Sequence, residues 1–233
     1  ILEGPLDLAA FRKAFSQLVA RHEILRTTFL RDTDGSPRQL VHAADTFDFA
    51  LEYLDVRQDA APQQKVAMLA DELSAWSFDL EKGPLMRVTL LQLDDLHCKV
   101  FFTMHHIISD GWSLDVLIKD LFPLYAANVQ GAPDPLLPLS IHYKDYTAWR
   151  NKHAVGEAFR QHKQYWLQQF DGNIPVLQLP TDFPRPAIQT YNGAVRTIRL
   201  NAVLSAGIQQ LAKENDVTVF AVLLTLINLL LYK

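Results

Sequence analysis

The sequence predicts an α+β fold, in which helices pack on an antiparallel or mixed sheet. Apolar residues recur at helical spacing in some segments and alternate, as in strands, in others. These segments follow one another without a strict strand–helix–strand alternation, and no internal repeat is visible. With 233 residues, of which 49% are hydrophobic and 21% charged, the chain is long enough for one large domain or two small lobes.

The first half of the chain is expected to open with a helix and to continue with short strands. Asp7 can cap a helix that reaches Arg21, because apolar side chains recur there every three or four residues. Asp34-Gly35 is a hairpin signal. The other expected elements are a strand entered within residues 21–29, its return strand at 39–42, a strand at 47–56, a helix that starts near Pro62, and a hairpin of residues 84–93 and 97–104.

The second half is expected to be richer in helices. A helix over residues 112–129 should be kinked or shortened by Pro123. Residues 174–187 are rich in proline, so we expect an irregular segment that separates two lobes. The remaining expected elements are a Pro-rich loop at 131–138, helices at 143–151 and 157–170, a strand at 194–200, a helix at 202–214 and an apolar helix at 217–232.

Charge and cysteine content exclude several classes of protein. The formal net charge of -4, without a long basic run, argues against a nucleic acid or an anionic membrane surface as partner. The single cysteine, Cys98, cannot form an internal disulfide, and no signal sequence opens the chain. We therefore expect a reducing, cytoplasmic setting.

The apolar run at residues 217–232 is shorter than the roughly 20 residues of a membrane span, so we interpret it as a buried amphipathic helix. Both ends of the chain are expected to be cut. It opens on Ile1 without an initiator methionine and closes inside this apolar run without a cap. We interpret the sequence as a fragment of something larger.

The segment that points most directly to chemistry is His-His-Ile-Ile-Ser-Asp-Gly at residues 105–111. A strand-like apolar run leads into it and a helix-like run leads out. A strand-to-helix junction can hold a titratable side chain rigidly beside a substrate. The pair of histidines is therefore a candidate for proton transfer.

Three chemical interpretations compete for this segment. A metal site would need three or four ligands, and His105 and His106 would point to opposite sides of an extended chain, so no metal is expected. A nucleophile activated by histidine would need an elbow motif that is absent, and Ser109 is too close in sequence. A single histidine as base or positioning group, with Asp110 as a structural anchor, needs the fewest assumptions. On these seven residues alone, a hydrogen-bonded core histidine without a catalytic role explains the pattern equally well.

Three longer motifs change that balance. Met-His-His-Ile-Ile-Ser-Asp-Gly-Trp-Ser at 104–113 resembles the core motif of condensation domains from nonribosomal peptide synthetases. Arg-His-Glu-x-Leu-Arg-Thr-x-Phe at 21–29 resembles an earlier motif of that family, and Tyr-x-Asp-Tyr-x-x-Trp at 143–149 is similar to a later one. Weaker similarities lie at 78–85, 165–166 and 179–186. The motifs come in the family's order over essentially all 233 residues.

The resemblance implies two lobes of the chloramphenicol acetyltransferase type that face each other across a cleft. Residues 1–180 would form the N-terminal lobe, with a mixed sheet packed by helices. Residues 181–233 would be a linker and the truncated beginning of a second, similar lobe. The fragment would then lack half of the cleft, and by itself it is expected to be inactive.

The resemblance also implies the reaction and its main catalytic residue. The amine of an aminoacyl thioester on one carrier protein would attack the donor acyl or peptidyl thioester on another, forming a peptide bond without an acyl-enzyme. His106 would orient that amine or take its proton. The backbone N–H of Gly111, at a helix start, would steady the oxyanion. His105 would support His106.

The remaining site residues are given structural tasks. By the same resemblance, Asp110 would be paired with a buried arginine, either Arg26 or a residue of the missing lobe, and its loss would damage folding. Arg21 and Trp112 would stabilise the motifs. Tyr143 is read as a packing or capping residue.

The resemblance implies no cofactor bound by the domain itself. Phosphopantetheine arms would be delivered by an upstream donor and a downstream acceptor peptidyl carrier protein. An adjacent adenylation domain and the missing C-terminal lobe would be the other partners. The product would belong to secondary metabolism, as antibiotics do.

Two other function classes stay open. An acyl-CoA-dependent acyltransferase of the same superfamily would share the His-x-x-x-Asp-Gly core, although the doubled histidine and the flanking motifs argue against it. A non-catalytic condensation-like domain would only recruit partner proteins, and such domains usually have a degraded core motif. An epimerising branch shares the histidine pair, but Trp112-Ser113 is more similar to the condensing branch.

Overall fold

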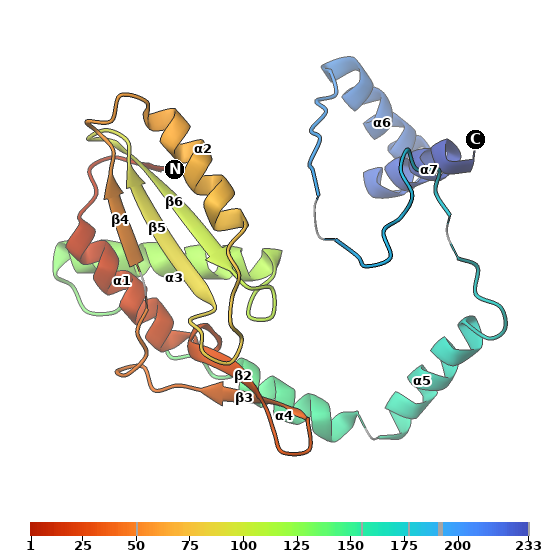
Figure 1. Cartoon of the computed structure of the whole chain (residues 1–233), viewed down its shortest axis with the longest axis horizontal. Helices are drawn as coiled ribbons and strands as arrows, with labels where there is room; N and C mark the ends of the chain where they lie inside the picture. The colour runs from red at the N-terminus through yellow and green to blue at the C-terminus, as the bar shows by residue number, and fades with distance from the viewer. Residues whose placement is uncertain (50, 155, 177, 191–192, 233) are drawn as a thin grey trace. The chain divides into compact units, whose positions relative to one another are not determined.

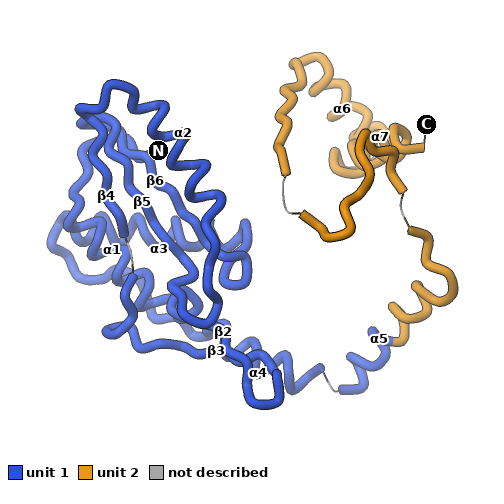
Figure 2. Tube along the Cα trace, viewed as in Figure 1, with its two compact units in different colours: residues 1–163 blue, residues 164–233 orange. Residues whose placement is uncertain are grey.

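The computed structural model describes residues 1–49, 51–154, 156–176, 178–190 and 193–232. The chain divides into two compact units, residues 1–163 and 164–233, coloured separately in Figure 2. The lobe boundary expected near residue 180 stays a prediction. The motif with the histidine pair lies in the first unit, which is described first.

The first unit is built on a four-stranded sheet with the order β1-β6-β5-β4 (Figure 1). Strands β4 and β5 run parallel, whereas β5 with β6 and β1 with β6 are antiparallel. The predicted mixed sheet and α+β class are thus confirmed. The bounds are β1 Leu2–Glu3, β4 Leu51–Asp55, β5 Met86–Gln92 and β6 His97–Met104, with a separate antiparallel hairpin of β2 Thr27–Arg31 and β3 Pro37–Val41.

Helices cover both faces of this sheet. Strand alternation sends one set of β5 and β6 side chains into the core under α1 (Leu8–Arg21) and α3 (Gly111–Gln130). The other set, with Leu91 and Phe101, packs in the cluster of α2 (Pro62–Ser74). The sheet is therefore the middle of three layers, and β6 carries side chains toward both outer layers.

The helix ends follow their sequence signals. The Asp7 carboxylate accepts the Ala10 N–H at 2.9 Å and caps α1 as predicted. Pro123 lies inside α3, which continues to Gln130, so the prediction that it shortens the helix is wrong. α3 ends at Gly131, whose φ of 66° is the left-handed conformation typical of a helix end.

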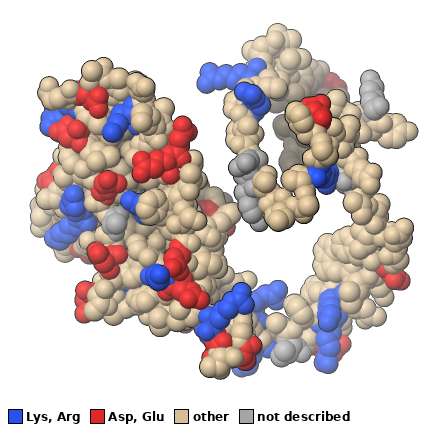
Figure 3. Space-filling model, viewed as in Figure 1, with Lys and Arg blue, Asp and Glu red and all other residues tan. Residues whose placement is uncertain are grey.

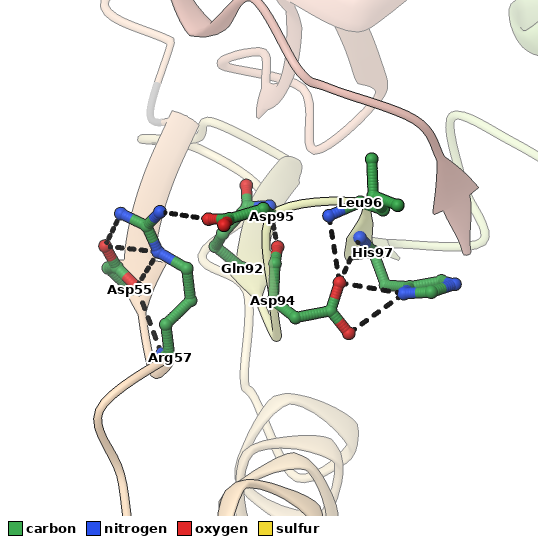
Figure 4. A network of polar contacts seen from close by, with 7 residues as sticks. All are labelled: Asp55, Arg57, Gln92, Asp94, Asp95, Leu96 and His97. Carbon is green, nitrogen blue, oxygen red and sulfur yellow. Dashed lines mark hydrogen bonds and ion pairs between the residues drawn. The ribbon is translucent and has the colours of Figure 1, made fainter.

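A polar network fixes the end of the sheet where β6 begins (Figure 4). Arg57 binds Asp55 at 2.7 Å and Asp95 at 2.6 Å, which joins the end of β4 to the β5–β6 turn. Hydrogen bonds from Arg57 lower the pKa of Asp55 to about 2. Asp94 accepts the N–H of His97 at 2.9 Å within the turn. The strand is thus anchored at the end opposite to its histidine pair.

Polar contacts attach α4 (Tyr143–His153) to the short helix η1 (Glu23–Arg26) and to β3. The Lys144 ammonium lies 2.7 Å from a carboxylate oxygen of Glu23, and Gln39 donates to Thr147 at 3.3 Å. Helix α5 (Glu157–Gln169) follows. On the face of the first unit shown in Figure 3, acidic and basic side chains are interspersed, as expected from the small net charge.

The second unit contains α6 (Ala202–Glu214) and α7 (Val219–Tyr232). The strand predicted at 194–200 is wrong, because these residues are irregular. Among the described helices, none alone has the length and apolar character to cross a membrane; α6 and α7 would meet both requirements only as a pair, which is bent by 105°.

Candidate active site

The histidine pair lies on the short loop between β6 and α3. His105 extends the β6 ladder, since its backbone N–H donates to the Leu85 carbonyl at 2.9 Å. Ile108 then packs into the core, 5% exposed, and its N–H donates to the His105 carbonyl at 3.1 Å. These contacts fix the loop to the residue that precedes β5 and to the core of the first unit.

His106 is exposed, and its ring is fixed by a backbone contact. Its Nδ1 donates to the Ser109 carbonyl three residues later. A carbonyl oxygen only accepts, so Nδ1 must carry the ring proton of the neutral imidazole. The lone pair is then on Nε2, which is the arrangement that a hydrogen-bond acceptor or general base requires.

His105 has the opposite arrangement of its ring nitrogens. Its Nδ1 accepts the Ile107 N–H at 3.0 Å, so the neutral ring carries its proton on Nε2. The ring of Phe78 meets it edge-on, with centroids 6.2 Å apart and planes at 89°. His105 is half-buried and shapes the loop on which His106 lies.

Asp110 is exposed and caps α3. Its carboxylate accepts the backbone N–H of Ser113 at 2.8 Å and the Ser113 hydroxyl at 2.6 Å, and these bonds lower the pKa of Asp110. The predicted buried pair of Asp110 with Arg26 is wrong. Arg26 instead donates to the His42 carbonyl and lies 3.6 Å from Glu23. Within the described residues, a local helix cap satisfies this carboxylate. An arginine partner in the missing lobe stays a prediction.

Gly111 is the first residue of α3, and a Cβ there would meet no atom within 4 Å. The backbone N–H groups at this helix start are thus approachable. Trp112 is 77% exposed, so within the described residues it has little packing role. Arg21 lies at the end of α1, where it donates to Asp120 of α3 at 2.8 Å and to the Leu137 carbonyl at 2.6 Å. Its predicted supporting role stays a prediction.

Two hollows flank His106, and its side chain belongs to the wall of both. The first, of about 250 Å³, is here called the Tyr143 hollow; it is lined by Ile24, His106, Ile107, Ile108, Ser109, Asp110, Ser113 and Tyr143. The second, of about 440 Å³, is here called the Trp76 hollow; it is lined by Ala70, Leu73, Ser74, Trp76, Phe78, Phe101, Phe102, Thr103, Met104, His105 and His106. Access from two sides suits a group that acts between two substrates.

Sequence reasoning missed several residues of these walls. Tyr143 was expected to pack or cap, whereas it is 49% exposed and lines the hollow named after it. Trp76 lies just after α2, which ends at Ser74, and lines the second hollow. Residues of the motifs at 21–29, 78–85 and 143–149 lie around the histidine loop. The order of the motifs in the sequence does not reveal this proximity. Within the described residues, no group of three His, Cys, Asp or Glu side chains is placed to hold a metal ion.

Comparison with known proteins identifies the family. A family model described as "Condensation domain" matches residues 1–233. The chain belongs to the condensation-domain family. Peptide bond formation is the general reaction of this family, and the expected family and α+β fold are confirmed.

The curated relatives of this condensation-family chain are nonribosomal peptide synthetases. It is 38% identical over 233 residues to gramicidin S synthase 2 of Aneurinibacillus migulanus, covering 100% of this chain and 5% of that protein. It is 36% identical to surfactin synthase subunit 1 of Bacillus subtilis (strain 168), covering 100% of this chain and 6% of that protein. The chain therefore spans a small part of the relatives that it matches.

Among solved structures, the chain is similar to the X-domain from teicoplanin biosynthesis, with a TM-score of 0.78 and 29% identity over 93% of this chain and 47% of that one. That X-domain has also been solved in complex with OxyB. The epimerization domain of the third module of tyrocidine synthetase B matches with a TM-score of 0.68 and 27% identity, over 78% of this chain and 40% of that one. The shared fold thus occurs with more than one role.

Proposed function

We propose that this chain is the His106-bearing part of an enzyme that forms peptide bonds between carrier-bound thioesters. The amine of an acceptor aminoacyl thioester attacks the carbonyl of a donor thioester, which forms the amide and releases the donor's thiol. The observation that carries the proposal is the ring orientation of His106. Because Nδ1 donates to the Ser109 carbonyl, Nε2 is free to accept a hydrogen bond or a proton from that amine.

Direct attack by the amine agrees with the side chains around His106. The hydroxyl of Ser109 points to the His105 carbonyl, at 3.4 Å, so it is not activated by an imidazole. Cys98 is fully buried, and burial raises the pKa of its thiol, which makes it a poor acyl acceptor. The described residues near His106 therefore favour a reaction without an acyl-enzyme.

Positioning of the two thioesters would supply much of the rate acceleration. Holding two thioesters in reactive geometry can contribute roughly 7–11 kcal/mol, and general-base help about 10²–10⁴-fold. The exposed start of α3 at Gly111 offers backbone N–H groups to the developing oxyanion.

The partners follow from the reaction. An upstream donor and a downstream acceptor peptidyl carrier protein would present phosphopantetheine arms, and an adjacent adenylation domain would load one of them. The similarity to multidomain synthetases supports this set. Residues 181–233 would begin the second lobe of the cleft, and the setting would be cytoplasmic.

Recruitment without catalysis is a second candidate, favoured by the similarity to the X-domain. The intact His-His-x-x-x-Asp-Gly motif and the oriented ring of His106 favour catalysis over it. Epimerization is a further possibility raised by the tyrocidine synthetase structure. An acyltransferase that uses free acyl-CoA would share the same histidine.

One experiment separates these functions. The full-length protein is supplied with two loaded carrier proteins, and intact mass spectrometry follows the donor group. Transfer onto the acceptor carrier supports condensation. Transfer from free acyl-CoA without a carrier would instead indicate an acyltransferase. Inversion of the donor's α-carbon without transfer would indicate an epimerase, and carrier binding without either reaction would indicate recruitment.

A further inference from the structure

The Trp76 hollow includes the histidine pair in its wall, but proton transfer by His106 does not require a cavity of this size. Its floor is β6, where Phe101 and Thr103 share the face toward α2 and His105 follows in the same alternation. Its side wall is the end of α2 with Ala70 and Leu73. A substrate held at His106 thus has a cavity of about 440 Å³ beside it.

Trp76 is the largest wall residue, and its ring is held in place. The guanidinium of Arg87 lies 3.7 Å from the centroid of the Trp76 ring, a cation–π contact. Arg87 is the register partner of Thr103, so it rises from the same face of the sheet as the floor. Although Trp76 is 44% exposed, this contact restrains its indole ring at the edge of the hollow.

The lining is partly aromatic and aliphatic and partly polar. The wall includes no Asp, Glu, Lys or Arg side chain, and its polar side-chain groups are two hydroxyls, the indole N–H of Trp76 and the two imidazoles. Phe78 meets the ring of His105 edge-on, and both side chains line the hollow beside His106. Apolar pockets with a few polar groups bind apolar ligand groups, and their size discriminates between side chains.

We propose that the Trp76 hollow binds the side chain of an aminoacyl group that reacts at His106, that this side chain is aromatic or large and aliphatic, and that Trp76 sets its size. This inference rests on the proposed function. The donor and the acceptor both carry an aminoacyl group, so the same chemistry has two possible sources. They are separated by varying one substrate at a time.

The test uses the full-length protein with loaded carrier proteins in two arms. In one arm the donor is phenylalanyl or alanyl with a fixed acceptor, and in the other the acceptor varies with a fixed donor. Trp76→Ala should lower the phenylalanyl-to-alanyl ratio of kcat/KM by roughly tenfold or more in one arm, because the larger side chain loses its wall. Trp76→Phe should lower it less. The matched control is Trp149→Ala, an indole 53% exposed on α4 and outside the hollow.

A ratio that changes by less than about threefold in both arms, or equally in Trp149→Ala, overturns the proposal. A separate readout covers a protein that makes no product. Hydrogen exchange of residues 70–78 is measured with non-reactive phenylalanyl- and alanyl-pantetheine amides. Stronger protection by the phenylalanyl amide supports the hollow even where condensation fails, and equal or absent protection overturns it.

Discussion

Arg21 and Asp120 are 99 residues apart in the chain, yet Nε of Arg21 donates to the Asp120 carboxylate at 2.8 Å. His22 contacts the same oxygen at 2.8 Å through Nε2. The end of α1 is thereby tied to the middle of α3, the helix that begins directly after the histidine loop. These contacts link the motif at 21–29 to the helix that follows the core motif, so the supporting role that we predict for Arg21 would act through α3 rather than through contact with substrate.

Removal of this pair should loosen α3. Both side chains are 17% exposed, and a hydrogen bond to a charged partner contributes about 1.5–3 kcal/mol. We expect Arg21→Ala to lower the free energy of local opening of α1 and α3 by that amount, measured by hydrogen exchange in the full-length protein. Asp120→Asn and the double variant complete the cycle. Fully additive single effects would contradict a direct coupling.

His22 should make this contact sensitive to pH. Burial lowers its pKa below the ordinary value of about 6.5, although Asp120 opposes the shift, while Arg21 and His142 add to it. The folded state therefore prefers neutral His22, and the unfolded state binds a proton first as the pH falls. The stabilisation that neutral His22 contributes is fully present above about pH 6.5, and it decreases as the pH falls below that value.

The measurement compares hydrogen exchange of α1 and α3 in wild type and His22→Gln at about pH 7.5 and about pH 5.5. Glutamine keeps a donor near Asp120 but does not titrate. The protection of wild type relative to the variant should fall at the lower pH. A ratio that is the same at both values would show that His22 does not titrate in this range.

Asp110 should matter as a helix cap. Asp110→Ala removes the acceptor for Ser113, so the first turn of α3 should exchange faster and transfer should slow by about ten- to a hundredfold through misplacement of the loop. Asp110→Asn can still cap and should restore both. Failure of asparagine to restore them would point to a requirement for the charge itself.

His105 should be replaceable by a residue that keeps one acceptor. Asparagine places an oxygen near the position of Nδ1 and can receive the Ile107 N–H, whereas alanine cannot. His105→Asn should therefore retain much more transfer activity than His105→Ala. Equal losses in the two variants would assign His105 a task beyond shaping the loop.

Local signals allowed much of the fold to be predicted. The cap at Asp7, the hairpin at Asp34-Gly35 and the turn before His97 each depend on neighbours in sequence, and each lies where predicted. The strand expected at 194–200 failed because a strand needs a hydrogen-bonding partner, which alternation alone does not reveal. The expectation that Pro123 shortens the helix failed because α3 is stabilised by core packing of residues such as Leu121 and Leu124.

The sequence predicted which residues form the site better than it predicted the contacts that these residues make. The resemblance drew attention to His106 and its loop, whose ring orientation then depends on a carbonyl three residues away. The pairing of Asp110 with Arg26 was wrong, because a local capping geometry took precedence over a distant ion pair. The contact of Arg21 with Asp120 and the wall formed by Trp76 depend on tertiary packing, which no local pattern encodes.

The most direct test of the account is the rate of donor transfer between two loaded carrier proteins for wild type and His106→Ala of the full-length protein. Intact mass spectrometry gives the rate, and hydrogen exchange of the β6–α3 loop reports its structure. We predict a loss of about 10²–10⁴-fold with unchanged exchange, since His106 is exposed and its loss opens no cavity. A variant that transfers within about threefold of the wild-type rate would contradict the central role of His106.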